Sequence, residues 1–131
     1  MHIDSSNYED WFLKAENDLR AAEAIMGYYE EPPTDTACYH CHQAAEKSLK
    51  SFLVYQGARL PWIHDLVELF NLCVGYNTEI EVLKEHIEVL NKYYIEAKYP
   101  ADIPVLFPKE EAGEAIEKTK MVQDGYRYYQ V

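Results

Sequence analysis

The chain has 131 residues, of which 48% are hydrophobic and 27% are charged, and its net charge is −11. This length fits one domain with a single core, and the acidic balance argues against unspecific binding of nucleic acid, because phosphate neutralisation needs an excess of lysine and arginine. No apolar run reaches the ~18 residues of a membrane span, and the acidic N-terminus lacks a signal-peptide core, so we expect a cytoplasmic protein without membrane contact.

The charges are unevenly distributed along the chain. Residues 1–36 carry nine acids and two bases, residues 65–98 carry seven and three, and residues 99–131 carry six and four. Residues 37–64 carry one acid and three bases, so this is the net basic segment of the chain. If the chain binds an anion, this is the segment that would attract it.

A first helix is expected to begin at Ser6, because Ser6 and Glu9 have the spacing of a capping box. Pro32 and Pro33 must end it. Apolar residues between these limits alternate spacings of four and three, which predicts a seam along another helix: Tyr8, Phe12, Ala15, Leu19, Ala22, Met26 and Tyr29.

A second helix is expected from a cap at Thr34 or Asp35 to about Gln56, with Gly57 as a left-handed terminus. Its two faces differ in polarity. The apolar face predicts a core contact and holds Cys38, Cys41, Ala45, Leu49 and Phe52. The opposite face is a polar stripe of Gln43, Glu46, Lys47 and Lys50.

Three more helices follow. Asp65 with Glu68 caps a short helix that ends at Gly75. Asn77 or Thr78 caps a fourth helix, whose heptad spacing runs through Ala97 and which stops before Pro100. Pro108 opens the last, in which Gly113 and Gly125 each cost about 1 kcal/mol relative to alanine. No stretch alternates like a strand. We therefore expect an all-α, up-and-down four-helix bundle with an additional short helix, about five helices in all, forming one domain over residues 1–131.

Cysteine and histidine near the start of the second helix invite a metal interpretation, because Cys38 and Cys41 have the gap of a zinc knuckle with His40 and His42 beside them. A closed site needs a further ligand, however, and small thiols facing a helical core are ordinary packing. Three cysteines cannot all pair, which favours reduced thiols. Glycine-rich phosphate loops are absent from the sequence. We expect neither a metal nor a cofactor.

Residues 42–51, HQAAEKSLKS, resemble the Gln-Ala-Ala-Glu-Lys-x-Leu-Lys-Ala signature of the HEPN domain family. Other segments resemble the family in the same order, and the resemblance runs from about Trp11 to Met121. These segments are Trp11 with Ala15 and Asp18-Leu19, then His64-Asp65-Leu66, and finally Lys98-Tyr99-Pro100, which resembles the family's Arg-Tyr-Pro turn.

The resemblance implies a bundle like the C-terminal domain of aminoglycoside nucleotidyltransferases, a homodimer, and a minimal nucleotidyltransferase as partner in a toxin–antitoxin pair. It also implies metal-independent ribonuclease activity in members that carry an arginine, four to six residues and then a histidine. Here Lys98 replaces the arginine, and Ile103 stands five residues further on. Arg59 and His64 have the required spacing, but they lie in the connector after the second helix.

We therefore predict a HEPN-like module that is catalytically weak or inactive and binds a nucleotide or RNA. The expected binding residues are Gln43, Glu46, Lys47, Lys50, His64, Asp65, Lys98 and Tyr99. One alternative is an endoribonuclease toxin that uses Arg59 and His64 as its catalytic pair. Another is a structural module whose polar stripe binds a protein.

Overall fold

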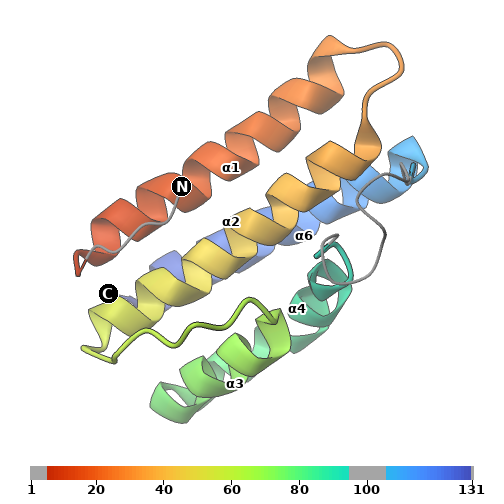
Figure 1. The fold of residues 1–131 in the computed structure, drawn as a ribbon. Coiled ribbons are helices and arrows are strands. Elements are labelled where there is room, and N and C mark those ends of the chain that lie inside the picture. Colours follow the sequence, from red (N-terminus) through yellow and green to blue (C-terminus); the bar gives the residue numbers. More distant parts are fainter. Residues whose placement is uncertain (1–5, 95–105, 131) are drawn as a thin grey trace.

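The computed structural model describes residues 6–94 and 106–130, and all of their regular structure is helical. Figure 1 shows a bundle of α-helices. The elements are α1 (Tyr8–Tyr28), α2 (Thr34–Tyr55), α3 (Leu66–Tyr76), the 3₁₀ helix η1 (Thr78–Leu83), α4 (Lys84–Asn91) and α6 (Lys109–Tyr129). The prediction of an all-α bundle with about five helices is confirmed.

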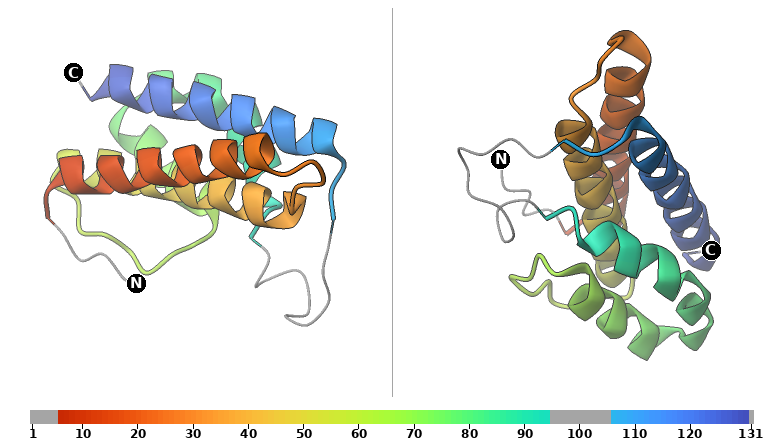
Figure 2. Two further views of the ribbon diagram at one scale, coloured as in Figure 1. Left: turned by 90° about the horizontal axis from the view of Figure 1, so that it is seen from above. Right: turned by 90° about the vertical axis from the view of Figure 1, so that its right-hand side faces the viewer.

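The helices form three layers. In the middle, α2 and α6 lie side by side, and α1 covers both from one side. On the other side, α3 packs against α2, while η1 and α4 pack against α6 (Figures 1 and 2). Because α2 contacts α1, α3, α4 and α6, it is the central element of the fold.

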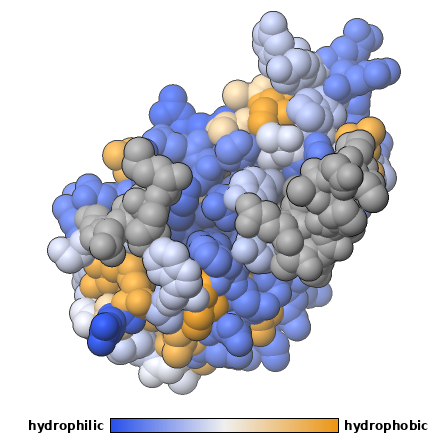
Figure 3. Space-filling view, in the orientation of Figure 1, coloured by the Kyte–Doolittle hydropathy of each residue, from blue (hydrophilic) through white to orange (hydrophobic). Residues whose placement is uncertain are grey.

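Helix α2 can be buried on several sides because it carries small residues where its neighbours approach. Ala37, Ala44, Ala45, Ser48 and Ser51 are all fully buried. The main core cluster draws side chains from every helix, including Phe12, Leu49, Phe52, Leu69, Phe70, Ile87, Leu90 and Tyr126. Figure 3 shows a mostly hydrophilic outer face, and within the described ranges a membrane-crossing helix is not found.

The caps of the first two helices differ from the sequence prediction. The cap of α1 lies one residue later than predicted, and α2 lacks the predicted side-chain cap. Asn7, not Ser6, caps α1, and its Oδ1 accepts a hydrogen bond of 2.9 Å from the N–H of Glu9. Pro33 precedes α2 without a side-chain cap. Thr34 is instead engaged at long range, because its hydroxyl oxygen accepts the Phe107 N–H at 2.9 Å. This bond ties the start of α2 to the approach to α6.

Gly57 ends α2 as predicted. Its φ of +76° lies in the left-handed region, and the Ala58 N–H donates to the Leu53 carbonyl at 2.9 Å. A second bond of 2.9 Å joins the Gly57 N–H to Val54, which completes a Schellman motif. This motif turns the chain sharply into the connector of residues 56–65.

The fourth predicted helix is divided. Asn77 caps the 3₁₀ helix η1, which leads into α4, and α4 ends at Asn91 instead of continuing toward Ala97. The chain turns where Tyr93 is buried: its ring lies edge-on to Phe107 at 5.1 Å, and its hydroxyl donates to Glu111 at 2.6 Å. Ala97 itself lies outside the described residues.

Candidate functional site

The connector of residues 56–65 returns along α2 (Figure 1). It thereby brings His64 beside Glu46, in the middle of that helix. Glu46 lies nine residues before the end of α2, which corresponds to roughly 14 Å of helix. Nevertheless, His64 Nδ1 lies 3.1 Å from Glu46 Oε2. The turn at Gly57 therefore creates a contact that the linear order of residues does not suggest.

Glu46 is a buried carboxylate that holds two cationic or potentially cationic groups. Its Oε2 also accepts a hydrogen bond of 2.9 Å from the Lys50 ammonium, one helical turn further along α2. Glu46 is 4% exposed and Lys50 is 6% exposed. The Lys50 ammonium lies 5.7 Å from the centre of the Trp11 ring, where a cation–π contact adds to the ion pair.

Aromatic rings stack beside this pair. The Tyr94 ring stacks on His42 at 5.3 Å and on His64 at 5.8 Å, with interplanar angles of 19° and 26°. Trp62 lies edge-on to His64 at 6.3 Å and is 75% exposed, and the His64 side chain is 43% exposed. We call these side chains the His64 cluster: His42, Glu46, Lys50, Trp62, His64 and Tyr94.

His42 lies at the closed inner end of the cluster. It is fully buried, and its Nδ1 lies 3.3 Å from the side-chain oxygen of Gln43. Burial lowers the pKa of His42 below its ordinary value of 6.5, because desolvation disfavours the imidazolium, although the charge of Glu46 acts in the opposite direction. His42 is therefore held as a neutral ring at neutral pH, whereas His64 is the histidine of this cluster that solvent can reach.

A second polar group joins α1 to α2. Asp18 accepts a hydrogen bond of 2.6 Å from the Lys47 ammonium, and its other oxygen lies 3.0 Å from Nδ1 of His40. Lys47 is thus directed to α1, and Lys50 is the lysine that pairs with Glu46. Asp18 has no counterpart among the expected binding residues, although it belongs to the segment that resembles the HEPN first helix.

The structure brings together three of the expected binding residues, Glu46, Lys50 and His64, and places Gln43 beside His42. Asp65 caps α3 through the Glu68 N–H, as predicted, and also accepts a hydrogen bond of 3.4 Å from Asn91. Arg59 is exposed on the connector, and Lys98, Tyr99 and Ile103 lie outside the described residues.

Sequence reasoning did not assign His42, Trp62 or Tyr94 to this site. Trp62 could have been assigned from the sequence, because it stands only two residues before His64. Tyr94 could not, because its stacking on His64 depends on how α4 packs in the fold. The polar stripe also differs from a solvent-facing surface, because Glu46 and Lys50 are buried. The returning connector and Trp11 cover this part of α2.

The cysteines and the other potential metal ligands of the described residues do not form a metal site. Over residues 6–94 and 106–130, no three His, Cys, Asp or Glu side chains converge as a metal site would require. Cys38, Cys41 and Cys73 are unpaired and buried. Burial raises the pKa of these thiols to about 12, 11 and 12, respectively, which disfavours the nucleophilic thiolate.

Comparison with known proteins gives the family. The HEPN domain model matches residues 8–125. The crystal structure of TT1696 from Thermus thermophilus superposes with a TM-score of 0.78 at 26% identity, covering 97% of this chain and 100% of that chain. ST0689, an archaeal HEPN homologue by its description, superposes with a TM-score of 0.75 at 23% identity, covering 95% and 98%. No sequence among the curated proteins matches. The chain belongs to the HEPN domain family.

Proposed function

We propose that this HEPN-domain protein binds a nucleotide or a short single-stranded RNA at the His64 cluster. The observation that carries this proposal is the position of His64. Its imidazole is fixed by Glu46 at 3.1 Å and by the Tyr94 ring, yet 43% of the side chain is exposed, next to the exposed Trp62. An oriented imidazole beside an exposed indole suits a ligand that has both a base and a phosphate.

Stacking is the larger part of the expected binding energy. Lys47 is paired with Asp18 and Lys50 with Glu46, so neither lysine presents an uncompensated charge to a phosphate. An aromatic ring stacked on a base contributes about 1–3 kcal/mol, and Trp62 has the exposure that such stacking needs. The net charge of −11 disfavours long polyanions, which is why the proposed ligand is short.

The proposed partner, oligomeric state and catalytic state rest on the resemblance to the family. We place the protein as the partner module of a minimal nucleotidyltransferase in a toxin–antitoxin-like pair, as a homodimer with weak or no catalysis of its own. Lys98 and Tyr99 stay in the proposed binding set, together with Gln43 and Asp65. The support for Lys98 and Tyr99 is the resemblance of Lys98-Tyr99-Pro100 to the family's Arg-Tyr-Pro turn. The support for Gln43 is its position beside His42, and Asp65 belongs to the segment that resembles the family's His-Asp-Leu opening.

Tryptophan fluorescence tests the binding proposal directly. The chain has two tryptophans, and because Trp11 is 4% exposed whereas Trp62 is 75% exposed, quenching by a ligand reports on Trp62. Titration with ATP and with short oligoadenylate should give saturable quenching. The variant Trp62→Phe should lose it, and His64→Ala should weaken binding measured by calorimetry by at least about fivefold.

The matched control is Tyr28→Ala, which removes an exposed aromatic ring from the end of α1. Binding by this variant should equal that of the wild type. If neither nucleotide nor oligonucleotide binds, or if His64→Ala and Trp62→Phe bind as the wild type does, the proposed site is wrong.

The Glu46–His64 contact also favours a second candidate function, a metal-independent endoribonuclease. A carboxylate that engages Nδ1 orients the ring and leaves Nε2 to exchange a proton with the RNA 2′-hydroxyl. Arg59, exposed on the same connector, would face the phosphate in this reaction. RNA incubated with a chelator and the wild type should then be cleaved, whereas His64→Ala should leave it intact; equal residual cleavage by both excludes this candidate.

A further inference from the structure

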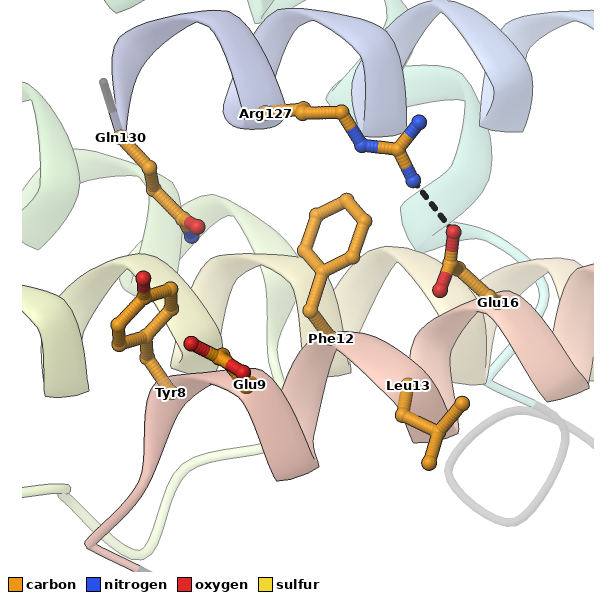
Figure 4. Close-up of a pocket in the computed structure, with 7 residues that line it drawn as sticks. All are labelled: Tyr8, Glu9, Phe12, Leu13, Glu16, Arg127 and Gln130. Carbon is orange, nitrogen blue, oxygen red and sulfur yellow. Dashed lines mark hydrogen bonds and ion pairs between the residues drawn. The ribbon is translucent and has the colours of Figure 1, made fainter.

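An open surface pocket of about 490 Å³, which we call the α1–α6 cavity, lies between the first half of α1 and the last turn of α6 (Figure 4). This volume falls in the range of roughly 300–1,000 Å³ that is typical of ligand clefts. None of its lining residues belongs to the His64 cluster. The cavity is therefore a separate feature, and what it binds does not depend on the proposed function.

The α1 wall of the cavity combines apolar surface with two carboxylates. Leu13, which is 55% exposed, supplies most of the accessible apolar part, because Phe12 is only 9% exposed. Glu9 and Glu16 flank them at seven residues' separation, which places their backbone positions about 10 Å apart on one face of the helix. Figure 4 shows Glu9 between Tyr8 and Phe12.

Arg127 shows how this wall holds a cation. Its guanidinium reaches from α6, lies 4.9 Å from the centre of the Phe12 ring and forms an ion pair with Glu16 (Figure 4). The cation–π contact and the carboxylate together make one guanidinium subsite, which the protein fills with its own side chain. At the other end of the cavity, Figure 4 shows the exposed Glu9 beside Tyr8, whose ring also packs edge-on against Tyr55 at 5.0 Å. A carboxylate and an aromatic ring are thus close together here too.

The charge of the surrounding surface indicates the class of ligand. Residues 6–36 carry eight acids and two bases, and the whole chain has a net charge of −11. Such a surface attracts cationic groups and repels acidic ones. Because the cavity also has apolar walls, its ligand should carry an apolar group next to a cation, as a basic peptide does.

We propose that the α1–α6 cavity docks a basic segment of a partner protein. An arginine of that segment places its guanidinium at Glu9 and Tyr8, and a neighbouring aliphatic side chain covers the exposed Leu13. Arginine suits the site better than lysine because its planar head can stack on a ring while it bonds to a carboxylate.

Fluorescence anisotropy with a labelled short peptide of alternating arginine and leucine tests this docking site. The wild type should bind it, and a peptide with glutamate in place of arginine should not bind. Glu9→Gln should weaken binding by about fivefold, the value of one ion pair at a partly exposed site. Leu13→Ser should weaken it by a similar factor, and both residues are exposed, so both variants should keep the circular dichroism spectrum of the wild type.

The matched control is Glu31→Gln, which removes one charge from the same acidic segment outside the cavity. It should change the affinity by less than about twofold. Equal weakening by Glu9→Gln and Glu31→Gln would mean that the acidic surface attracts the peptide without a defined site, and the proposal would be wrong. Light scattering must also give the same mass for the wild type and Leu13→Ser, since a dimer that Leu13→Ser dissociates would make the cavity a self-interface.

Discussion

Glu46 places a negative charge inside the bundle, and the surrounding residues are arranged around it. Lys50 and His64 both bond to its Oε2, and Lys50 also contacts Trp11. A buried ion pair of this kind adds little net stability compared with apolar packing, but losing one partner leaves an uncompensated charge. The Glu46–Lys50 ion pair is therefore not a major source of stability. Its structural role is to hold the Glu46 carboxylate in the position where it orients His64.

Acid should destabilise the fold through His42. Burial lowers the pKa of His42 in the folded state below 6.5, with His64 acting in the same direction and Glu46 and Asp65 acting against it. The unfolded chain therefore binds this proton more readily. The stabilisation is complete above about pH 6.5, where the unfolded state is also neutral, and is lost as the pH falls from there toward the folded pKa.

Urea unfolding between about pH 7.5 and pH 5.5 measures this effect, whose slope for one group is at most about 1.4 kcal/mol per pH unit. The variant His42→Phe keeps a ring against Tyr94 and should have a smaller slope than the wild type. His40→Gln, which changes the partly exposed histidine beside Asp18, leaves His42 intact and should keep its contribution. An unchanged slope in His42→Phe would contradict the assignment.

Three of the predicted binding residues, Glu46, Lys50 and His64, lie together in the His64 cluster. The spacing of Glu46 and Lys50 follows from one helix, so their pairing was within reach of sequence reasoning. The contact of Glu46 with His64 could not be predicted from the sequence, because it requires the connector to return along α2. Likewise, the pairing of Lys47 with Asp18 depends on the register of α1 against α2, which no local pattern specifies.

Among the elements, α6 shows how one residue type acts differently along a single helix. Both Gly113 and Gly125 lie in its interior, where glycine costs about 1 kcal/mol relative to alanine. A Cβ at Gly113 would meet nothing within 4 Å, whereas a Cβ at Gly125 would lie 2.7 Å from Cδ1 of the buried Leu83. Gly125 therefore allows η1 to approach α6.

Alanine substitutions should separate these roles. Gly113→Ala should raise the free energy of unfolding by about 0.5–1 kcal/mol through helix propensity alone. Gly125→Ala should lower it by about 1 kcal/mol, because displacing Leu83 outweighs the same gain. Urea unfolding of the two variants and the wild type gives both signs, and a gain of equal size in both would show that Leu83 moves aside freely.

The ends of elements were predictable where a single residue decides them. Gly57 has the left-handed conformation that its position after α2 suggested, and Asp65 caps α3. The division of the fourth helix was not foreseen, since its heptad spacing continues through Tyr94 while the chain turns at Tyr93. That turn is driven by contacts with Phe107 and Glu111, which are distant in sequence.

At the scale of the whole molecule, one apolar cluster joins every described helix. It includes all three cysteines, with Cys38 and Cys41 on α2 and Cys73 on α3. The layers have no separate cores, because α2 contacts both α1 and the pair α3 and α4. A domain with a single shared core is expected to unfold in one cooperative step.

The thiols provide a test of that cooperativity. In native buffer, a thiol-specific disulfide reagent should react with none of them at an appreciable rate, since each is buried and has a raised pKa. As denaturant is added, all three should react at one common rate that follows global unfolding, so mass spectrometry should find molecules with no label or with three labels. Early labelling of Cys73 alone would instead show that α3 opens independently of α1, α2 and α6, which a shared core does not allow.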